Sequence, residues 1–238
     1  MRRVVRGFWG PRRESERELA VRWSALLARL RDIDATVFGT WQGVPGTGTD
    51  TGRDTPVRIE HGALAGYLLK DGAGDDWSDQ KGLALALSTP AGCPARVGVN
   101  GTGGGVSDHL PMSVVLTITV PDGGPALPYA DILRAVAETW DVDWGEVTGT
   151  ELQLALEDDG RVPGQPCAGW AGYLSARRAA LLAAADLPLP MTAHPTDHGG
   201  VLLDLSAAGV QEVVEANRHL RATGALEPLP RPMDRPKL

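Results

Sequence analysis

The stretch RGFWGPRRESERELAVRWSALLARL, residues Arg6–Leu30, contains the strongest local structural signals in the sequence. Ser15 and Glu18 have the S-x-x-E spacing of a helix capping box. After them, leucines and a tryptophan recur every three or four residues, and arginines occupy the opposite face. This pattern predicts an amphipathic helix that begins after Ser15 and packs its apolar face on the rest of the protein.

The residues before this helix predict how the chain enters it. Phe8 and Trp9 are expected to end an edge strand, and Gly10-Pro11 is expected to turn the chain. Arg12 can then reach back to a carboxylate or to free backbone carbonyls, since a guanidinium carries five N–H donors. We therefore expect this cluster to fasten the first helix to a sheet.

Two further helices are predicted, one starting at Pro128 and one spanning about 209–223, before Gly224. Short β-rich runs lie around them, at Thr36–Trp41, Leu83–Ser88, Ser113–Val120, Glu151–Leu156, Trp170–Leu174 and Val201–Leu205. Because successive strands are not separated by long helices, antiparallel pairing is favoured. The sequence predicts an α+β fold, with a mainly antiparallel sheet packed by about three helices.

The predicted domain organisation is a single α+β domain over residues 1–226, followed by a proline-rich tail at 227–238. Both this tail and the Gly/Thr-rich loop Gly43–Asp54 have few apolar residues to pack, so they are expected to be mobile.

Composition excludes several classes of function. The chain has 238 residues, 42% of them hydrophobic, and a formal net charge of -7. An acidic surface disfavours nucleic acid and favours basic protein partners. No apolar run is long enough to span a membrane or to form a signal segment, so a cytoplasmic location is expected. Cys93 and Cys167 have neither the spacing nor the neighbours of a metal site, and no metal or cofactor is predicted.

Two short segments resemble sites of chemistry but are incomplete. The glycines of Gly101–Gly105, followed by Asp108 and His109, do not complete a phosphate-binding motif, and a flexible loop between strands is the favoured interpretation. The segment His194–His198 has two histidines and an aspartate at a spacing that could hold a metal, but a solvated turn is favoured because no other ligands are apparent.

Acidic residues cluster at three places in the sequence. Those around Trp144, namely Asp141, Asp143 and Glu146, are expected to be solvated loop charges. The other two clusters are candidates for binding a partner, since carboxylates near an exposed tryptophan combine electrostatic steering with a contact anchor. The candidate binding residues are Asp75, Asp76, Trp77, Asp79, Glu157, Asp158 and Asp159.

Tryptophan is unusually abundant, with seven residues against three tyrosines and two phenylalanines. Three of them lie on apolar faces and are expected in the core, at Trp23, Trp41 and Trp140. Three others stand beside a glycine, where the ring could lie over exposed backbone, at Trp9, Trp144 and Trp170. This usage indicates a packing scaffold rather than a reaction centre.

Three short motifs occur in an order that resembles the immunity protein 52 family: W-G-P-R before the first helix, W-x-x-x-W-G, and G-W-x-x-Y-L. The residues that carry the resemblance are Trp9, Gly10, Arg12, Trp140, Trp144, Gly169, Trp170 and Tyr173. The central motif departs from the family pattern at Val142, where a proline is common. The family comprises α+β immunity proteins of bacterial polymorphic toxin systems, encoded beside toxins that often carry a nuclease domain.

The resemblance implies a non-enzymatic inhibitor that binds a cognate toxin, with a basic nuclease domain as the expected partner. It also implies that the motif residues are mainly structural. Two alternatives stay open at the level of sequence. One is an enzyme acting on a small molecule or nucleotide through Gly101–Gly105, Asp108 and His109, and the other is a structural subunit of a larger assembly.

Overall fold

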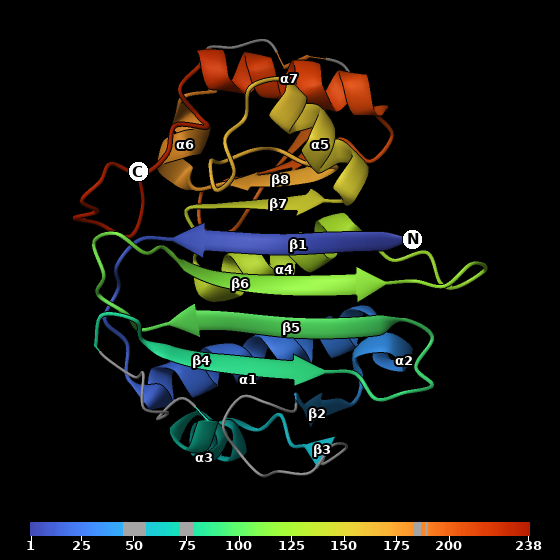
Figure 1. Cartoon of the computed structure of the whole chain (residues 1–238), viewed down its shortest axis with the longest axis vertical. Helices are drawn as coiled ribbons and strands as arrows, with labels where there is room; N and C mark the ends of the chain where they lie inside the picture. The colour runs from blue at the N-terminus through green and yellow to red at the C-terminus, as the bar shows by residue number, and fades with distance from the viewer. Residues whose placement is uncertain (45–55, 72–78, 183–186, 189) are drawn as a thin grey trace.

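The computed structural model describes residues 1–44, 56–71, 79–182, 187–188 and 190–238. These residues form one ten-stranded sheet in the order β3-β2-β4-β5-β6-β1-β7-β8-β10-β9, with every neighbouring pair antiparallel (Figure 1). The strands are β1 (Arg2–Trp9), β2 (Trp41–Gly43), β3 (Pro56–Val57), β4 (Leu83–Ser88), β5 (Arg96–Gly103), β6 (Met112–Thr119), β7 (Trp144–Thr148), β8 (Ala171–Leu174), β9 (Thr192–Pro195) and β10 (Val201–Asp204). The predicted α+β class with an antiparallel sheet is confirmed.

The described residues contain seven helices rather than about three. They are α1 (Glu16–Ile33), α2 (Ala35–Phe38), α3 (His61–Asp71), α4 (Tyr129–Trp140), α5 (Thr150–Asp158), α6 (Ala176–Ala180) and α7 (Val210–Ala222). The three predicted helices are α1, α4 and α7, and the predicted capping box is present, with Ser15 accepting from the backbone N–H of Glu18. The short helices α2 and α6 were missed because they contain too few residues to show a helical period.

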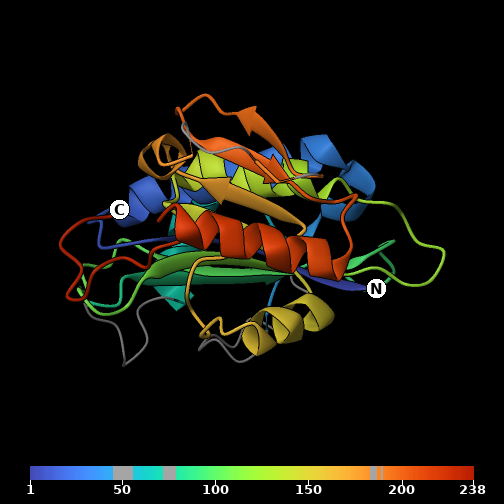
Figure 2. The same ribbon diagram turned by 90° about the horizontal axis from the view of Figure 1, so that it is seen from above.

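Helices α1 and α4 pack on one face of the sheet, and α5 lies on the other (Figure 2). We call the face under α1 and α4 the covered face. Its floor on β5 is built of glycines: a Cβ on Gly101 would lie 3.1 Å from the Trp23 ring, and one on Gly103 would lie 2.8 Å from Leu19. The segment predicted as a flexible glycine loop is therefore partly a strand, whose missing side chains let the helices approach closely.

A second hydrophobic cluster lies at the β8 end of the sheet, where α5 and α7 pack together. Leu152 and Leu156 of α5 are buried there with Val213 and Leu220 of α7. The predicted strand at Glu151–Leu156 is wrong: residues four apart share one helix face, so Leu152 and Leu156 are buried while Leu154 between them is 57% exposed.

Two other expectations about strands are also corrected. The run Thr36–Trp41 is mostly helix α2, which Asp34 caps by accepting from the backbone N–H groups of Thr36 and Val37, and only Trp41 begins a strand. Strand β1 is not an edge strand. It is hydrogen-bonded to β6 along its whole length and to β7 from Val4 to Phe8.

The C-terminal segment, expected to be a mobile tail, contacts the body of the protein at several points. The backbone N–H of Gly10 donates to the Pro236 carbonyl at 2.8 Å, and the Met233 N–H donates to the Asp108 carbonyl at 2.6 Å. Lys237 also forms an ion pair with Asp141. The Gly/Thr-rich loop predicted at Gly43–Asp54 lies almost entirely outside the described residues.

None of the helices in the described part of the chain combines the length and the hydrophobicity needed to cross a membrane.

Candidate functional site

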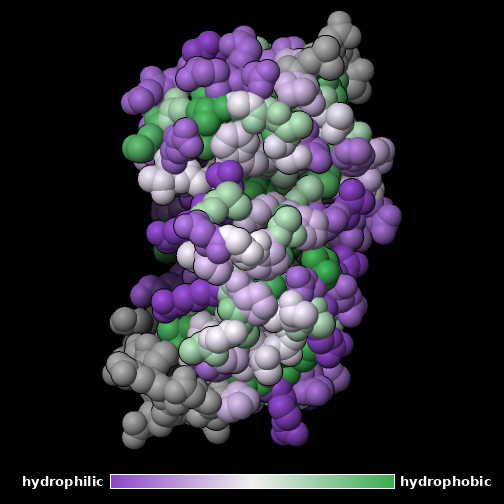
Figure 3. Space-filling model, turned by 90° about the vertical axis from the view of Figure 1, so that its right-hand side faces the viewer, coloured by the Kyte–Doolittle hydropathy of each residue, from purple (hydrophilic) through white to green (hydrophobic). Residues whose placement is uncertain are grey.

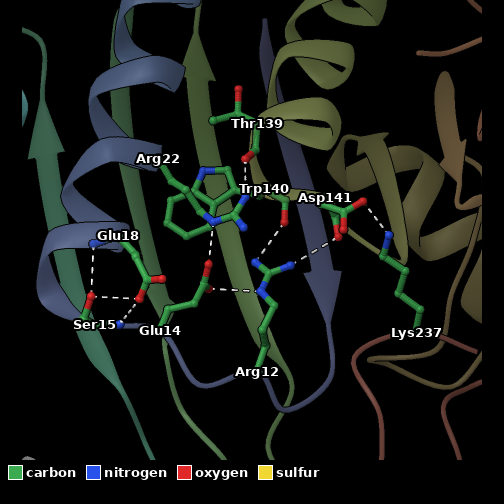
Figure 4. A network of polar contacts seen from close by, with 9 residues as sticks. All are labelled: Arg12, Glu14, Ser15, Glu18, Arg22, Thr139, Trp140, Asp141 and Lys237. Atoms are coloured by element: carbon green, nitrogen blue, oxygen red, sulfur yellow. Dashed lines mark hydrogen bonds and ion pairs between the residues drawn. The ribbon is translucent and has the colours of Figure 1, made fainter. Parts of the chain in front are cut away.

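The N-terminal motif is tied to the end of α4 by two arginines (Figure 4). Arg12 donates from Nη2 to the Trp140 carbonyl at 2.9 Å, and Arg22 donates from Nη1 to the Thr139 carbonyl at 2.7 Å. The Glu14 carboxylate accepts from both guanidinium groups, at 3.0 Å and 2.5 Å. The two cations thereby satisfy carbonyls that a helix C-terminus leaves without partners, and the prediction that Arg12 reaches back to carbonyls and a carboxylate is confirmed.

Burial also affects the charge of this network. Desolvation lowers the pKa of the Arg12 guanidinium, and the nearby Glu14 carboxylate acts in the opposite direction. Arginine starts from so high a pKa that it stays charged in such a site. The Arg12 side chain therefore acts as a fixed cationic clamp between the start of α1 and the end of α4.

Tryptophans of the first two motifs meet directly beneath this clamp. Trp9 stacks on Trp140 with ring centroids 5.2 Å apart, and Trp23 meets Trp140 edge-on at 4.8 Å. All three are at most 1% exposed, so Trp9 does not lie over exposed backbone as expected but belongs to the core. Gly10 is required beside it, since a Cβ there would lie 2.2 Å from the Arg235 carbonyl oxygen.

The third motif closes the packing between β7 and β8. A Cβ on Gly169 would lie 1.8 Å from the Val147 carbonyl oxygen, so only glycine fits. Trp170 lies under the Arg3 guanidinium at 4.9 Å, and Tyr173 is 1% exposed. Burial raises the pKa of Tyr173 to about 12. Trp144 of the central motif is buried against Phe8, with centroids 4.3 Å apart.

The carboxylates around Trp144 are mostly buried, which corrects the expectation of solvated loop charges. Asp143 and Arg178 form a fully buried ion pair, with Arg178 donating from Nη2 and Nε at 2.7 and 3.0 Å. Ser175 donates to the other carboxylate oxygen at 2.9 Å. The remaining Arg178 donor reaches the carbonyls of Ala225 and Glu227. Arg178 of α6 thereby joins the residue before β7 to the segment after α7.

Glu146 is the centre of a second buried polar group, beneath α5. It lies 3.4 Å from Arg6 and 3.5 Å from Arg161, and the Cys167 thiol donates to it. Desolvation and then the Glu146 charge raise the pKa of Cys167 well above its ordinary value, so the thiol stays protonated. Asp143 and Glu146 are thus both paired with residues of the same chain.

The candidate partner-binding acids fall into three situations. Asp75, Asp76 and Trp77 lie outside the described residues. Asp79 is exposed and lies 3.5 Å from the equally exposed Arg13. Glu157 and Asp158 are exposed at the end of α5, which is a helix and not the expected loop, whereas Asp159 accepts hydrogen bonds from Arg218 and Arg221 of α7. Those bonds lower the pKa of Asp159.

The residues considered for catalysis do not assemble. Tryptophan and leucine side chains fill the space over Gly101 and Gly103. Asp108 and His109 form an exposed pair 3.6 Å apart. Within the described ranges, no group of three or more metal-binding side chains occurs, and His194 and His198 are exposed.

A family model of Immunity protein 52 matches residues 4–224. The chain belongs to the Immunity protein 52 family. The sequence has no significant match among curated proteins. Among solved structures it is similar to the Pseudomonas aeruginosa T6SS protein PA0821, with a TM-score of 0.51 and 12% identity, over 94% of this chain and 72% of that chain. At this identity the likeness concerns the fold alone.

In this member of the Immunity protein 52 family, the sheet has a second surface that the sequence did not reveal. We call it the open face. It consists of the even-numbered residues of β1, β4 and β5 and the odd-numbered residues of β6, which are exposed or half-buried, whereas the residues between them are buried except Arg3 and Leu83, which are half-buried. The open face is turned toward the viewer in Figure 1, where α1 and α4 lie behind the sheet.

The open face contains two adjoining hollows. The larger, about 680 Å³, is lined by residues of β2, β4, β5 and β6 that include Gly98. The smaller, about 420 Å³, lies between β1 and the start of α5 and is lined by Arg6 and Gln153 among others. Arg2 and Thr117 line both. The sequence signal for the open face was the alternation of inward and outward positions along β5. The glycines of this strand made the alternation hard to recognise, because they have no apolar or polar side chain.

Proposed function

We propose that this member of the Immunity protein 52 family is a non-catalytic inhibitor that binds and neutralises a cognate toxin of a bacterial polymorphic toxin system, in the cytoplasm. The observation that carries the proposal is the family match over residues 4–224. The motif residues agree with it, because Trp9, Arg12 and Trp140 hold the scaffold together and are not arranged around a reactive group.

We further propose that the toxin carries a basic nuclease domain. The net charge of -7 supports this, since opposite charge raises the association rate of two proteins. Glu157 and Asp158 are exposed and unpaired among the described residues, and they are proposed to contribute to this steering together with Asp75, Asp76 and Asp79. Trp77 is proposed as a contact anchor within that last group.

The competing proposal of an enzyme has less support. The glycines that such an enzyme would use serve the packing of α1 and α4 on β5, and the Asp108 carbonyl is hydrogen-bonded to the C-terminal segment.

The edge of the molecule in Figure 3 does not show one large apolar area, since hydrophobic residues (green) are scattered there among hydrophilic ones (purple). A toxin contact on that edge would therefore be polar in character.

The proposal is tested with the product of the neighbouring gene. We expect expression of the chain to restore growth to cells that produce this protein, and we expect the chain to co-purify with a catalytically inactive variant of it. The complex should melt at a higher temperature than the free chain, because a ligand that binds only the folded state stabilises it.

The same melting assay also tests the alternative that the protein is an enzyme. Nucleotides and common metabolites, added one at a time, should leave the melting temperature of the chain unchanged. A shift with one of them, together with no protection and no co-purification, would replace the inhibitor by the enzyme.

A further inference from the structure

Gly98 lies on the open face, where nothing among the described residues requires a glycine. A Cβ built on it meets nothing within 4 Å, and its backbone is not in the left-handed region. On the same strand, a Cβ on Gly101 or Gly103 would collide with neighbouring atoms at 2.5 Å and 2.8 Å. Glycine weakens a strand and is found where another molecule approaches the backbone closely. Gly98 therefore leaves room for another molecule to approach the backbone of the sheet.

The neighbours of Gly98 are also small. Ser88 on β4 and Thr117 on β6 are its partners in the register, and Ala84 and Ala86 occupy the other outward positions of β4. Alanine, serine and glycine contribute little to a solvated strand, where β-branched residues are favoured. The small side chains leave the larger hollow open over the backbone of β4 and β5.

Two arginines border this hollow without acidic partners. Arg96 on β5 and Arg2 on β1 flank Thr119 of β6 in one cross-strand row, which places their Cα atoms about 10 Å apart. Both are exposed, and neither forms an ion pair within the part of the chain that the structure describes. On a chain with a net charge of -7, this row is a local positive patch.

The area of the open face shows what else a partner must touch. Four strands of about eight residues make a surface about 25 Å by 15 Å. Its area is smaller than the roughly 800 Å² that each protein contributes to a stable complex. Helix α5 adjoins the smaller hollow through Thr150 and Gln153. Leu154, four residues after Thr150 on the same side of the helix, is 57% exposed and offers an apolar contact.

We propose that the open face, with the adjoining side of α5, is the surface that docks the toxin, and that it receives a patch of the toxin that carries carboxylates opposite Arg2 and Arg96. This inference rests on the proposed function and adds the contact surface and its charge. The exposed acidic residues, including Glu157 and Asp158 at the end of α5, steer the encounter, and the open face holds the complex. A close approach over Gly98 excludes water from the arginine pairs, which strengthens them.

Two substitutions test the proposal on the full-length chain, with a catalytically inactive toxin variant as the ligand. Gly98→Thr adds a side chain that a strand favours and should leave the melting temperature unchanged or raise it, but it should weaken toxin binding by about tenfold or more. Its control is Gly66→Ala on α3, where a Cβ also meets nothing within 4 Å and binding should stay the same.

Arg96→Glu tests the charge of the patch. It should weaken toxin binding by about tenfold at low ionic strength and by less in high salt. Arg17→Glu makes the same change of charge on α1, on the opposite side of the sheet, and should have a much smaller effect.

The docking surface and the proposed function can be disproved separately. If the wild-type chain binds the toxin and both Gly98→Thr and Arg96→Glu bind it with the wild-type dissociation constant, the docking surface lies elsewhere and the proposed function stands. If the wild-type chain neither binds nor protects, the proposed function is wrong, and the docking proposal is overturned with it.

Discussion

Gly103 and Gly98 lie on the same strand, five residues apart, and face opposite sides of the sheet. Gly103 is on the covered face, where Leu19 and Trp140 occupy the space that a side chain would need. Gly98 is on the open face, where that space is empty. Internal packing thus explains the glycine on the covered face, whereas no contact among the described residues explains the glycine on the open face. The comparison shows that a glycine's neighbours, and not the residue type, decide whether the packing of the chain accounts for it.

Charged residues differ between the two regions in the same way. Asp143 and Arg178 form an ion pair that is fully buried inside the protein. Arg2 and Arg96 on the open face are exposed without ion pairs among the described residues. If this comparison is correct, substitutions in covered regions should reduce stability, and substitutions on the open face should reduce binding alone.

The largest loss of stability is expected for Asp143→Ala. The substitution leaves the Arg178 guanidinium buried without its partner, and breaking such pairs lowers the free energy of unfolding by about 4 kcal/mol. Denaturant unfolding measures this loss. The matched control is Asp79→Ala, which breaks the exposed pair with Arg13 and should change stability by less than about 0.5 kcal/mol. Equal effects at the two sites would contradict the distinction between covered and exposed charges.

Trp9→Ala is expected to follow, with a loss of about 3 kcal/mol or more, because the cavity would lie against Trp140 in the core. The melting temperature and the toxin affinity should be measured together. An unchanged melting temperature with lost binding would move Trp9 from the core to the interface.

The pair Gly103→Ala and Gly98→Ala tests the comparison directly. The first should lower the free energy of unfolding by about 2 kcal/mol, since Leu19 and Trp140 would have to move. The second should leave it unchanged or raise it by about 0.5 kcal/mol, because alanine restricts the unfolded chain more than glycine. Similar losses for both variants would mean that the open face is covered in solution.

Alkaline pH probes the covered group beneath α5. The pKa of Cys167 is raised in the folded state, so the folded protein keeps this proton where the unfolded thiol, with a pKa of about 8.5, has lost it. The stabilisation is complete below that pH and is lost above it, at up to about 1.4 kcal/mol per pH unit. Cys167→Ala should therefore flatten the decline in stability between about pH 8.5 and 10. An unaltered decline would indicate that water reaches the thiol in the folded state.

The smallest effect is expected for the steering charges. Replacing Glu157 and Asp158 by Gln and Asn should slow association with the toxin by about threefold at low salt and leave dissociation unchanged. Stopped-flow measurements at increasing salt would follow the difference as it disappears, since the Debye length falls to about 3 Å at 1 M. Association rates that respond neither to the substitutions nor to salt would remove the electrostatic part of the proposal.

The sequence predicted those elements whose signals are local. The capping box at Ser15, the start of α4 at Pro128 and the end of α7 before Gly224 are each encoded within a few residues. The alternation of Leu152, Leu154 and Leu156 predicted a strand, because Leu152 and Leu156, which share a helix face, are also alternate positions of a strand, and the exposed Leu154 completes that pattern. The central place of β1 could not be predicted, since its partner strands follow a hundred residues or more later.

The same limit applies to the candidate site. The kind of contact that Arg12 makes was predictable, because a guanidinium has five N–H donors to place on oxygen atoms, but its partner at the end of α4 was not, since it lies 128 positions further along the chain. The burial of Asp143 was not, because its partner Arg178 lies 35 positions further along the chain. The open face depends on the order of four strands in the sheet, and nothing within any one strand specifies that order.

The position of β1 has a consequence for how the protein is made. Arg2 pairs with Thr119 and Val4 pairs with Thr148, so the centre of the sheet closes only after most of the chain exists. Ribosomes add about 5 to 20 residues per second, which leaves the first strand without its partners for roughly 6 to 30 seconds. Proteins with such distant strand pairs also fold slowly, because the entropy of closing a long loop is lost before the contacts that compensate for it form. Under the proposed function, protection could begin only after the sheet has closed, so the protein would have to be made before the toxin arrives.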